Sequence, residues 1–209
     1  MAFSTVSRKS YTREEREAIR ASMLRRASEV FSSNGLRVTS LEDVYVPEGI
    51  SKTFFYTFFP SKIALITEVF RIQSVEILEA VRSNVWEYGS MNCMREVFRE
   101  VMEGRWYIAS IDDQVYLRTI MSDEEFNGFK NDRIVLFAEI LNILGVPVSR
   151  LDPRVFYNML MSVVWTGRSD SGSVPFLYGE VSKVSTDILL DHLVEYVGGL
   201  RVDSGKDTF

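Results

Sequence analysis

Apolar residues recur every three or four positions through most of this chain, the spacing that places them on one face of an α-helix. The first such segment begins at the capping-box pattern Thr12–Glu15 and ends near Asn34–Gly35, a typical helix stop. A second start pattern, Ser40–Asp43, is followed by Pro47, which ends a helix early because proline has no backbone N–H to donate. The pattern then predicts a short helix over residues 51–58.

A long apolar helical pattern follows from Pro60 to about Gly89. The Asp152–Pro153 pair, an N-cap followed by proline at the first helical position, opens a helix that runs to about Gly167 and is apolar nearly all round. We find no convincing strand, so the pattern indicates an all-α protein. The other predicted helices span 91–108, 112–121, 123–128, 129–144 and 178–198, with a flexible loop over 168–175 and a loose tail after residue 201.

Composition narrows the class of protein. With 209 residues and 46% hydrophobic content, the chain can bury a substantial core. No apolar run approaches the ~20 residues that span a bilayer, and the N-terminus lacks the apolar stretch of a secretion signal. The single cysteine, Cys93, excludes an internal disulfide. We therefore expect a cytoplasmic protein with no membrane partner.

Charge is distributed unevenly along the chain. The net charge is −5, which taken alone argues against a nucleic-acid partner. Residues 1–62, however, carry ten Lys and Arg against seven Asp and Glu, and the rest of the chain carries 14 against 22. Phosphate binding needs local positive charge, so a basic N-terminal region on an acidic body is compatible with DNA binding.

Residues 39–62 hold the most informative pattern. A short helix, a glycine and a second short helix have the spacing of a helix-turn-helix, whose second helix enters the DNA major groove. From about Arg16 to Leu65 the sequence resembles the DNA-binding half of the tetracycline-repressor (TetR) family of bacterial regulators. The residues that fall at the family's spacing are Phe31, Gly35, Thr39, Ser40, Asp43, Gly49, Ser51, Tyr56, Phe59, Ser61 and Lys62.

The resemblance implies a DNA-contacting surface. Side chains that open the second helix reach base edges, so Lys52 and Thr53 are candidates for selecting sequence, whereas Tyr56 and Lys62 are assigned to phosphates. The predicted DNA-binding residues are Thr39, Ser40, Ser51, Lys52, Thr53, Tyr56, Thr57 and Lys62.

The apolar residues around Gly49 are expected to be buried contacts that fix the angle between the two helices, while Gly49 itself allows the sharp turn. These expected core residues are Val44, Ile50, Phe55 and Phe59.

Several residues depart from the family's pattern. Tyr45 and Glu48 stand where the family usually has alanine, and Thr53 stands where it usually has glycine. Tyrosine needs more room between helices, and Glu48 brings negative charge close to the phosphates. Phe54 and Phe58 either pack inward or touch thymine methyls. An alternative therefore stays open, a TetR-like small-molecule-binding or protein-interaction module with weakened DNA binding.

For the rest of the chain, the resemblance implies a helical body that dimerises through its last two long helices and holds a ligand pocket. The helix over 152–167 agrees with this, because it is too apolar to be covered on one side only. Aromatic residues and methionines are dense from Trp86 to Trp165, where they either line a pocket for a flat ligand or fill a core. The candidate ligand-binding residues are Trp106, Tyr107 and Phe156.

Little in the sequence favours an enzyme. The one histidine, His192, directly follows Asp191, and adjacent helix residues do not face each other. We see no Cys/His cluster with metal-ligand spacing and no glycine-rich phosphate loop, so we expect no cofactor and no metal. Cys93 is expected to be a small buried hydrophobe rather than an oxidant sensor.

The helical pattern predicts an all-α protein of about nine helices. The resemblance implies a three-helix helix-turn-helix head over residues 1–60 and a larger ligand-binding and dimerisation body over 61–209. The expected function is that of a homodimeric transcriptional regulator. We expect a repressor that a small-molecule effector releases from a palindromic double-stranded DNA operator.

Overall fold

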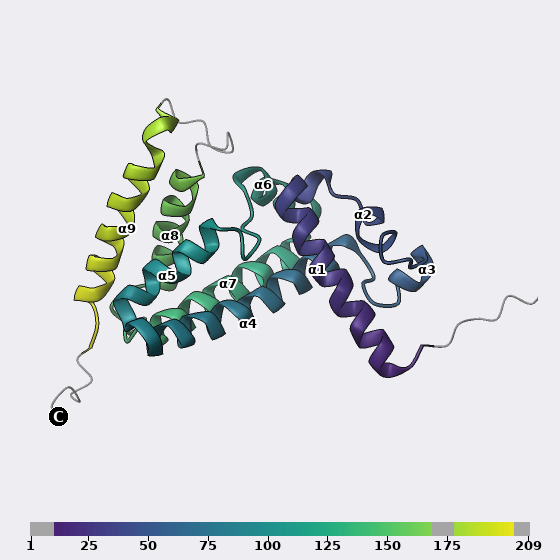
Figure 1. Ribbon diagram of the computed structural model, residues 1–209, viewed down its shortest axis with the longest axis horizontal. Helices are drawn as coiled ribbons and strands as arrows, with labels where there is room; N and C mark the ends of the chain where they lie inside the picture. The colour runs from purple at the N-terminus through teal and green to yellow at the C-terminus, as the bar shows by residue number, and fades with distance from the viewer. Residues whose placement is uncertain (1–10, 169–177, 203–209) are drawn as a thin grey trace, which may run out of the picture.

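The computed structural model describes residues 11–168 and 178–202, and within these ranges the chain is helical with no strand (Figure 1). The predicted all-α class is therefore confirmed. Most of the predicted loop over 168–175, and the tail from residue 203 on, lie outside the described residues. The helices are α1 (Arg13–Val38), α2 (Glu42–Tyr45), α3 (Lys52–Phe55), α4 (Lys62–Tyr88), α5 (Ser90–Met102), α6 (Ile111–Ile120), α7 (Asp123–Ile143), α8 (Pro153–Gly167) and α9 (Ser182–Gly199), with a 3-10 turn at Gly179–Val181 before α9.

Side-chain caps explain where six of these helices begin, namely α1, α3, α4, α6, α7 and α8. Thr12 and Glu15 form the predicted reciprocal capping box at the start of α1. Ser61 caps α4, and Asp152 caps α8 with proline at its first position. Asp113 and Glu125 complete the capping boxes that open α6 and α7.

Several predicted helix boundaries are wrong: α3 ends at Phe55 rather than near residue 58, α9 begins at Ser182 rather than near residue 178, and two larger differences have a clear cause. The helix expected to reach residue 108 ends at Met102, because Gly104, with φ of 85°, lets the chain turn back so that the Arg105 N–H bonds the Glu100 carbonyl. The break expected after Gly128 is absent, and α7 continues through it. A single glycine lowers helix propensity, but the packing of α7 against α4 and α8 outweighs that cost.

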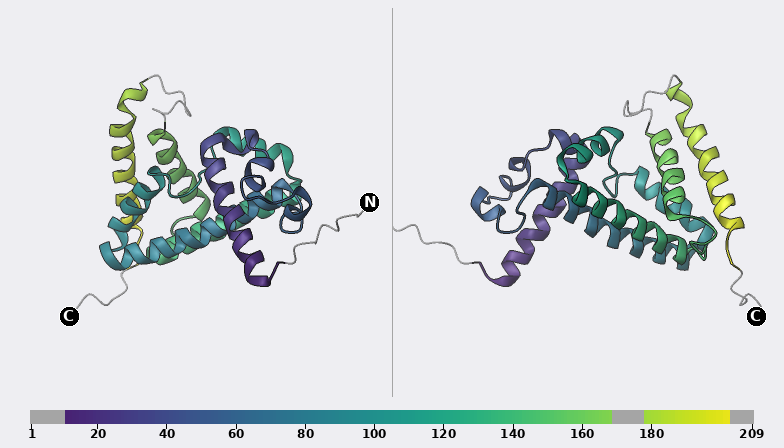
Figure 2. Two further views of the ribbon diagram at one scale, coloured as in Figure 1. Left: turned by 45° about the vertical axis from the view of Figure 1, so that its right-hand side comes forward. Right: turned by 180° about the vertical axis from the view of Figure 1, so that it is seen from behind.

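The helices are arranged with the head at one end and the last two helices at the other. Figure 1 and both views of Figure 2 show α4 and α7 side by side between the α1–α3 head and the α8–α9 pair. The helix α6 lies beside the end of α1, where it contacts the head. In the described part of the chain, no helix combines the length and the apolar composition that a bilayer span requires.

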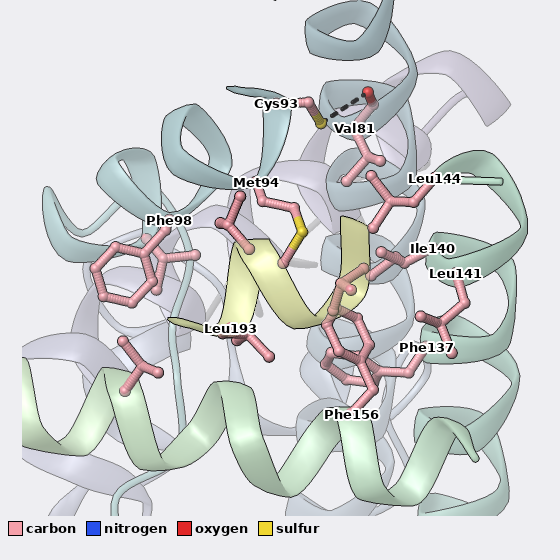
Figure 3. Packing of buried hydrophobic residues seen from close by; sticks show 14 of the residues in the cluster. Val81, Cys93, Met94, Phe98, Phe137, Ile140, Leu141, Leu144, Phe156 and Leu193 are labelled. Atoms are coloured by element: carbon pink, nitrogen blue, oxygen red, sulfur yellow. Dashed lines mark hydrogen bonds between the residues drawn. The ribbon is translucent and has the colours of Figure 1, made fainter. Parts of the chain in front are cut away.

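Two hydrophobic clusters hold these parts together. The first packs the head against the start of α4 and against α6. Its buried residues therefore lie on both sides of the boundary predicted at residue 60, with Leu65, Ile66 and Leu117 on the far side. The second fills the space between α4, α5, α7, α8 and α9 (Figure 3). Cys93 is buried in this second cluster as predicted, with its thiol donating to the Val81 carbonyl at 3.4 Å.

Candidate nucleic-acid interface and ligand cavity

The turn between α2 and α3 has the geometry that its glycine permits. Gly49 has φ of 68°, its N–H bonds the Val46 carbonyl at 3.0 Å, and the Ile50 N–H bonds the Tyr45 carbonyl at 3.1 Å. This pair of bonds closes a helix through a left-handed residue, a conformation that residues with a side chain rarely adopt. The four predicted core residues of the head are all buried: Val44, Ile50, Phe55 and Phe59.

The start of α3 presents polar side chains to solvent. Ser51 caps the helix by accepting the Phe54 N–H at 3.3 Å. Lys52, Thr53 and Thr57 are exposed, and Tyr56 is 41% exposed. Five of the eight predicted DNA-binding residues therefore lie together on the exposed side of one short helix and its flanks.

Lys62 is turned toward the protein. Its Nζ donates to the carbonyls of Leu36 and Thr39, both at 2.6 Å, and to the Tyr116 hydroxyl at 3.2 Å. The ammonium thus holds the end of α1 against the start of α4 and against α6. A cation is favourable there because it meets the free carbonyls at the C-terminal end of a helix.

Thr39 and Ser40 are also occupied within the head. Thr39 is only 2% exposed, and its hydroxyl donates to the Gly35 carbonyl at 2.7 Å. The Ser40 hydroxyl and N–H both donate to the Asp43 carboxylate, at 2.8 and 2.7 Å, in the predicted capping-box arrangement. These hydrogen bonds lower the pKa of Asp43.

The bulky residues that depart from the family's pattern are accommodated by packing. Tyr45 is buried, with its ring 5.4 Å from that of Phe55 and its hydroxyl donating to Glu42 at 3.0 Å. Phe54 and Phe58 are half-buried and pack edge to face at 5.0 Å. The Arg16 guanidinium lies over the Phe58 ring at 4.7 Å, so these two rings pack against α1 rather than standing free.

The body contains a cavity of about 350 Å³ between α4, α6, α7 and α8, mostly lined by apolar side chains. Of the three predicted ligand-binding residues, Tyr107 lines it and Phe156 lines a smaller neighbouring space of about 80 Å³. Trp106 lines neither, since its ring is buried in the second cluster and its Nε1 donates to Glu76 at 3.2 Å. The aromatic-rich stretch, predicted to line a pocket or fill a core, supplies four more ring residues of the larger cavity, and Phe70 is a further one that the sequence analysis missed. The four are Phe126, Phe129, Phe137 and Tyr157.

Arg133 was also missed, although it projects into this cavity region from α7. Its Nη2 donates to the Ser74 hydroxyl at 2.8 Å, and its guanidinium lies over the rings of Phe70 and Phe129 at 5.2 and 5.4 Å. Burial lowers the pKa of Arg133. The sequence does hold a signal for this position. Arg133 lies one helical turn from Phe129 and one turn from Phe137, so it falls on the apolar side of its helix.

Asp113 connects the cavity wall to the head. This carboxylate is 4% exposed, and its Oδ1 accepts the Leu36 N–H of α1 at 2.7 Å. Its Oδ2 accepts the Tyr107 hydroxyl at 2.6 Å and the Ser110 hydroxyl at 2.8 Å. Burial and this carboxylate raise the pKa of Tyr107. Tyr107, which lines the cavity, is therefore linked to the last turn of α1 through the Asp113 side chain.

Residues considered for catalysis do not gather into a cluster. His192 is exposed, and its Nδ1 lies 2.8 Å from the Ile188 carbonyl of its own helix. Cys93 is buried, and burial raises the pKa of its thiol to about 11. Among the described residues, no three His, Cys, Asp or Glu side chains lie close enough together to hold a metal ion.

Comparisons with known proteins support the same architecture. A scan of protein-family models finds no match, and neither does a search of curated proteins. A search of solved structures finds the crystal structure of a TetR-family transcriptional regulator from Pectobacterium atrosepticum, with a TM-score of 0.57 and 21% sequence identity over 92% of this chain and 99% of that one. This chain therefore has the fold of a TetR-family transcriptional regulator.

Proposed function

We propose that this protein is a homodimeric, ligand-responsive transcriptional regulator that represses by binding a palindromic DNA operator and is released by a small molecule. The observation that carries the proposal is the exposed start of α3, where Lys52, Thr53 and Tyr56 stand on a helix fixed by the Gly49 turn. A helix presented in this way can enter a major groove, with its first residues at the base edges.

Ligand response is supported by the path from the cavity to the head. Tyr107 lines the cavity and donates to Asp113, which in turn accepts the Leu36 N–H at the end of α1. A ligand that displaces Tyr107 or α6 would alter how α1 is held. Release requires that the ligand bind the two arrangements unequally, and about 1.4 kcal/mol of difference shifts their ratio tenfold.

Dimerisation is supported by the outward face of the last helix. Val184 and Ile188, one helical turn apart on α9, are exposed, as is Val155 on α8. Exposed apolar side chains on a packed helix pair are suited to a two-fold interface, which would set two heads about 34–36 Å, or a multiple of that, apart on DNA.

The test is selection of a binding site from a random DNA pool, followed by titration of the selected duplex at several salt concentrations. We expect a palindromic site and an affinity that falls steeply with salt. The double variant Lys52→Ala/Thr53→Ala should weaken binding at least about tenfold, because each lost base contact costs about 1–3 kcal/mol. Lys130→Ala, which removes an exposed lysine from the body, is the matched control and should change affinity little. Failure to enrich any sequence, together with no salt-sensitive DNA binding, would refute the proposal.

A second candidate, an interaction module with weakened DNA binding, is favoured by the internal bonds of Lys62 and Thr39. Glu48→Ala separates the two, because it restores the family's usual residue at a partly exposed position and leaves both buried Tyr45 and the proposed base contact Thr53 in place. A gain of tenfold or more in DNA affinity favours the module, and little change favours the regulator.

A further inference from the structure

The charged side chains that line the larger cavity all have one sign among the described residues. They are Lys130, Arg133 and Arg154, and no Asp or Glu of the described ranges lines it. This is unexpected for the acidic part of the chain, where acidic side chains outnumber basic ones. The cavity is thus a locally positive region in a negatively charged body.

The three cations differ in how they are held. Lys130 and Arg154 are exposed at the rim, and Arg154 is paired with Asp152. Arg133 is the interior one, and among the described residues no carboxylate lies within salt-bridge distance of it. Its Nε is buried and finds no hydrogen-bond acceptor in that part of the chain.

A guanidinium in this position is costly unless an anion meets it. Taking a charge out of water is unfavourable, and the neutral Ser74 hydroxyl, the Phe70 carbonyl at 3.4 Å and the aromatic rings offset only part of that cost. A carboxylate is the group that matches the planar fork of arginine with two parallel hydrogen bonds. The surrounding walls, including Phe70, Phe126 and Phe129, suit a flat apolar body.

We propose that the cavity binds an organic acid carrying one carboxylate, with the carboxylate on Arg133 and a compact ring system against the phenylalanine walls. The volume of about 350 Å³ is near the lower end of the range for small-molecule sites, about 300–1,000 Å³, so the body is one or two rings. This inference rests on the proposed function, because it names the class of effector for the cavity assigned there.

The test compares acids with their neutral amides by isothermal titration calorimetry on the full chain without DNA. The probes are benzoate, 2-naphthoate and biphenyl-4-carboxylate, each against its carboxamide. We expect at least one acid to bind the wild type tenfold or more tightly than its amide, and Arg133→Met to bind that acid and amide alike. Arg82→Met removes the same charge from an exposed position of α4 that does not line the cavity, and should keep the preference to within about threefold.

Arg133→Lys keeps the positive charge but loses the planar pair of N–H donors, so it should retain only part of the preference for the acid over the amide. If Arg133→Met does not fold, the ratio of acid affinity to amide affinity is compared between the wild type and Arg133→Lys, and a smaller ratio in the variant supports the proposal. The proposal is overturned if no probe acid binds better than its amide, or if Arg133→Met preserves the preference. Because DNA is absent, loss of the acid preference is distinguishable from failure to bind an operator.

Discussion

At the scale of single residues, Asp113 ties three parts of the chain together, because its buried carboxylate on α6 accepts from Leu36 of α1 and from Tyr107 and Ser110 in the segment before α6. We predict that Asp113→Asn destabilises the protein by about 1–3 kcal/mol, since an amide cannot accept all of these donors and leaves buried groups unpaired. Unfolding in a chemical denaturant measures this change in the free energy of unfolding. Asp112→Asn, at the exposed neighbouring position, should stay within about 0.5 kcal/mol of the wild type. Equal stabilities for the two variants would contradict the assigned role.

Glu68 gives a prediction about pH. It accepts from Arg20 of α1 and from Arg71 of α4, and bonds to Arg71 are the main cause that lowers its pKa to about 2, with Arg20 adding to it. A lowered carboxylate pKa stabilises the fold above the ordinary value of 4.5, and that contribution is lost as the pH falls toward 2. Glu68→Gln should therefore cost about 1–2 kcal/mol at pH 7, allowing for solvent screening, and progressively less from pH 5 down to 3. A difference from the wild type that does not change with pH would contradict this.

Local chemistry explains which residues were predictable. The core of the head and the Gly49 turn follow from hydrophobic spacing and from backbone conformation, both of which are properties of a few neighbouring residues. The roles of Lys62 and Asp113 depend on partners 54 and 77 positions away in the chain, so no local pattern specifies them. The direction of the Lys62 side chain could not be inferred from its place in the motif.

At the scale of elements, the helix starts were predictable because capping side chains lie within three residues of the groups they satisfy. Helix lengths were less predictable than helix starts, because tertiary packing decides whether a single glycine ends a helix. The glycines of α7 and α8 show this difference. A Cβ at Gly128 would meet nothing within 4 Å, whereas at Gly167 it would lie 2.7 Å from the Met102 Cε and 3.2 Å from the Thr186 Oγ1.

We therefore predict opposite outcomes for two identical substitutions. Gly128→Ala should stabilise the protein by about 0.5–1 kcal/mol, because alanine loses less conformational entropy in a helix. Gly167→Ala should destabilise it, because the end of the Met102 side chain and the buried Thr186 side chain must move to admit the methyl group. Thermal unfolding of the two variants measures the contrast. A loss of stability in Gly128→Ala would show that α7 is not continuous through this position.

For the whole molecule, the two ends carry the two proposed interactions, with the head on one side and the α8–α9 face on the other (Figures 1 and 2). Val184 on α9 and Val135 on α7 are 60% and 63% exposed, so they are a matched pair in residue type and exposure. Val184→Asp should produce monomers at micromolar concentration, because it buries a charge in the proposed interface. Val135→Asp should leave the dimer intact. Analytical ultracentrifugation distinguishes the two, and a wild type that sediments as a monomer would rule out the proposed assembly.

The buried thiol of Cys93 has a practical consequence for measuring how the heads move. With a pKa of about 11, only about one thiol in ten thousand is ionised at pH 7, and the thiolate is the form that reacts with maleimides. The native chain is therefore a nearly unreactive background for labelling. A cysteine introduced at an exposed head position such as Thr57 would take up a spin label or a fluorophore almost exclusively. In the proposed dimer, paired labels would then report the separation of the two copies of α3 directly, with and without an organic acid.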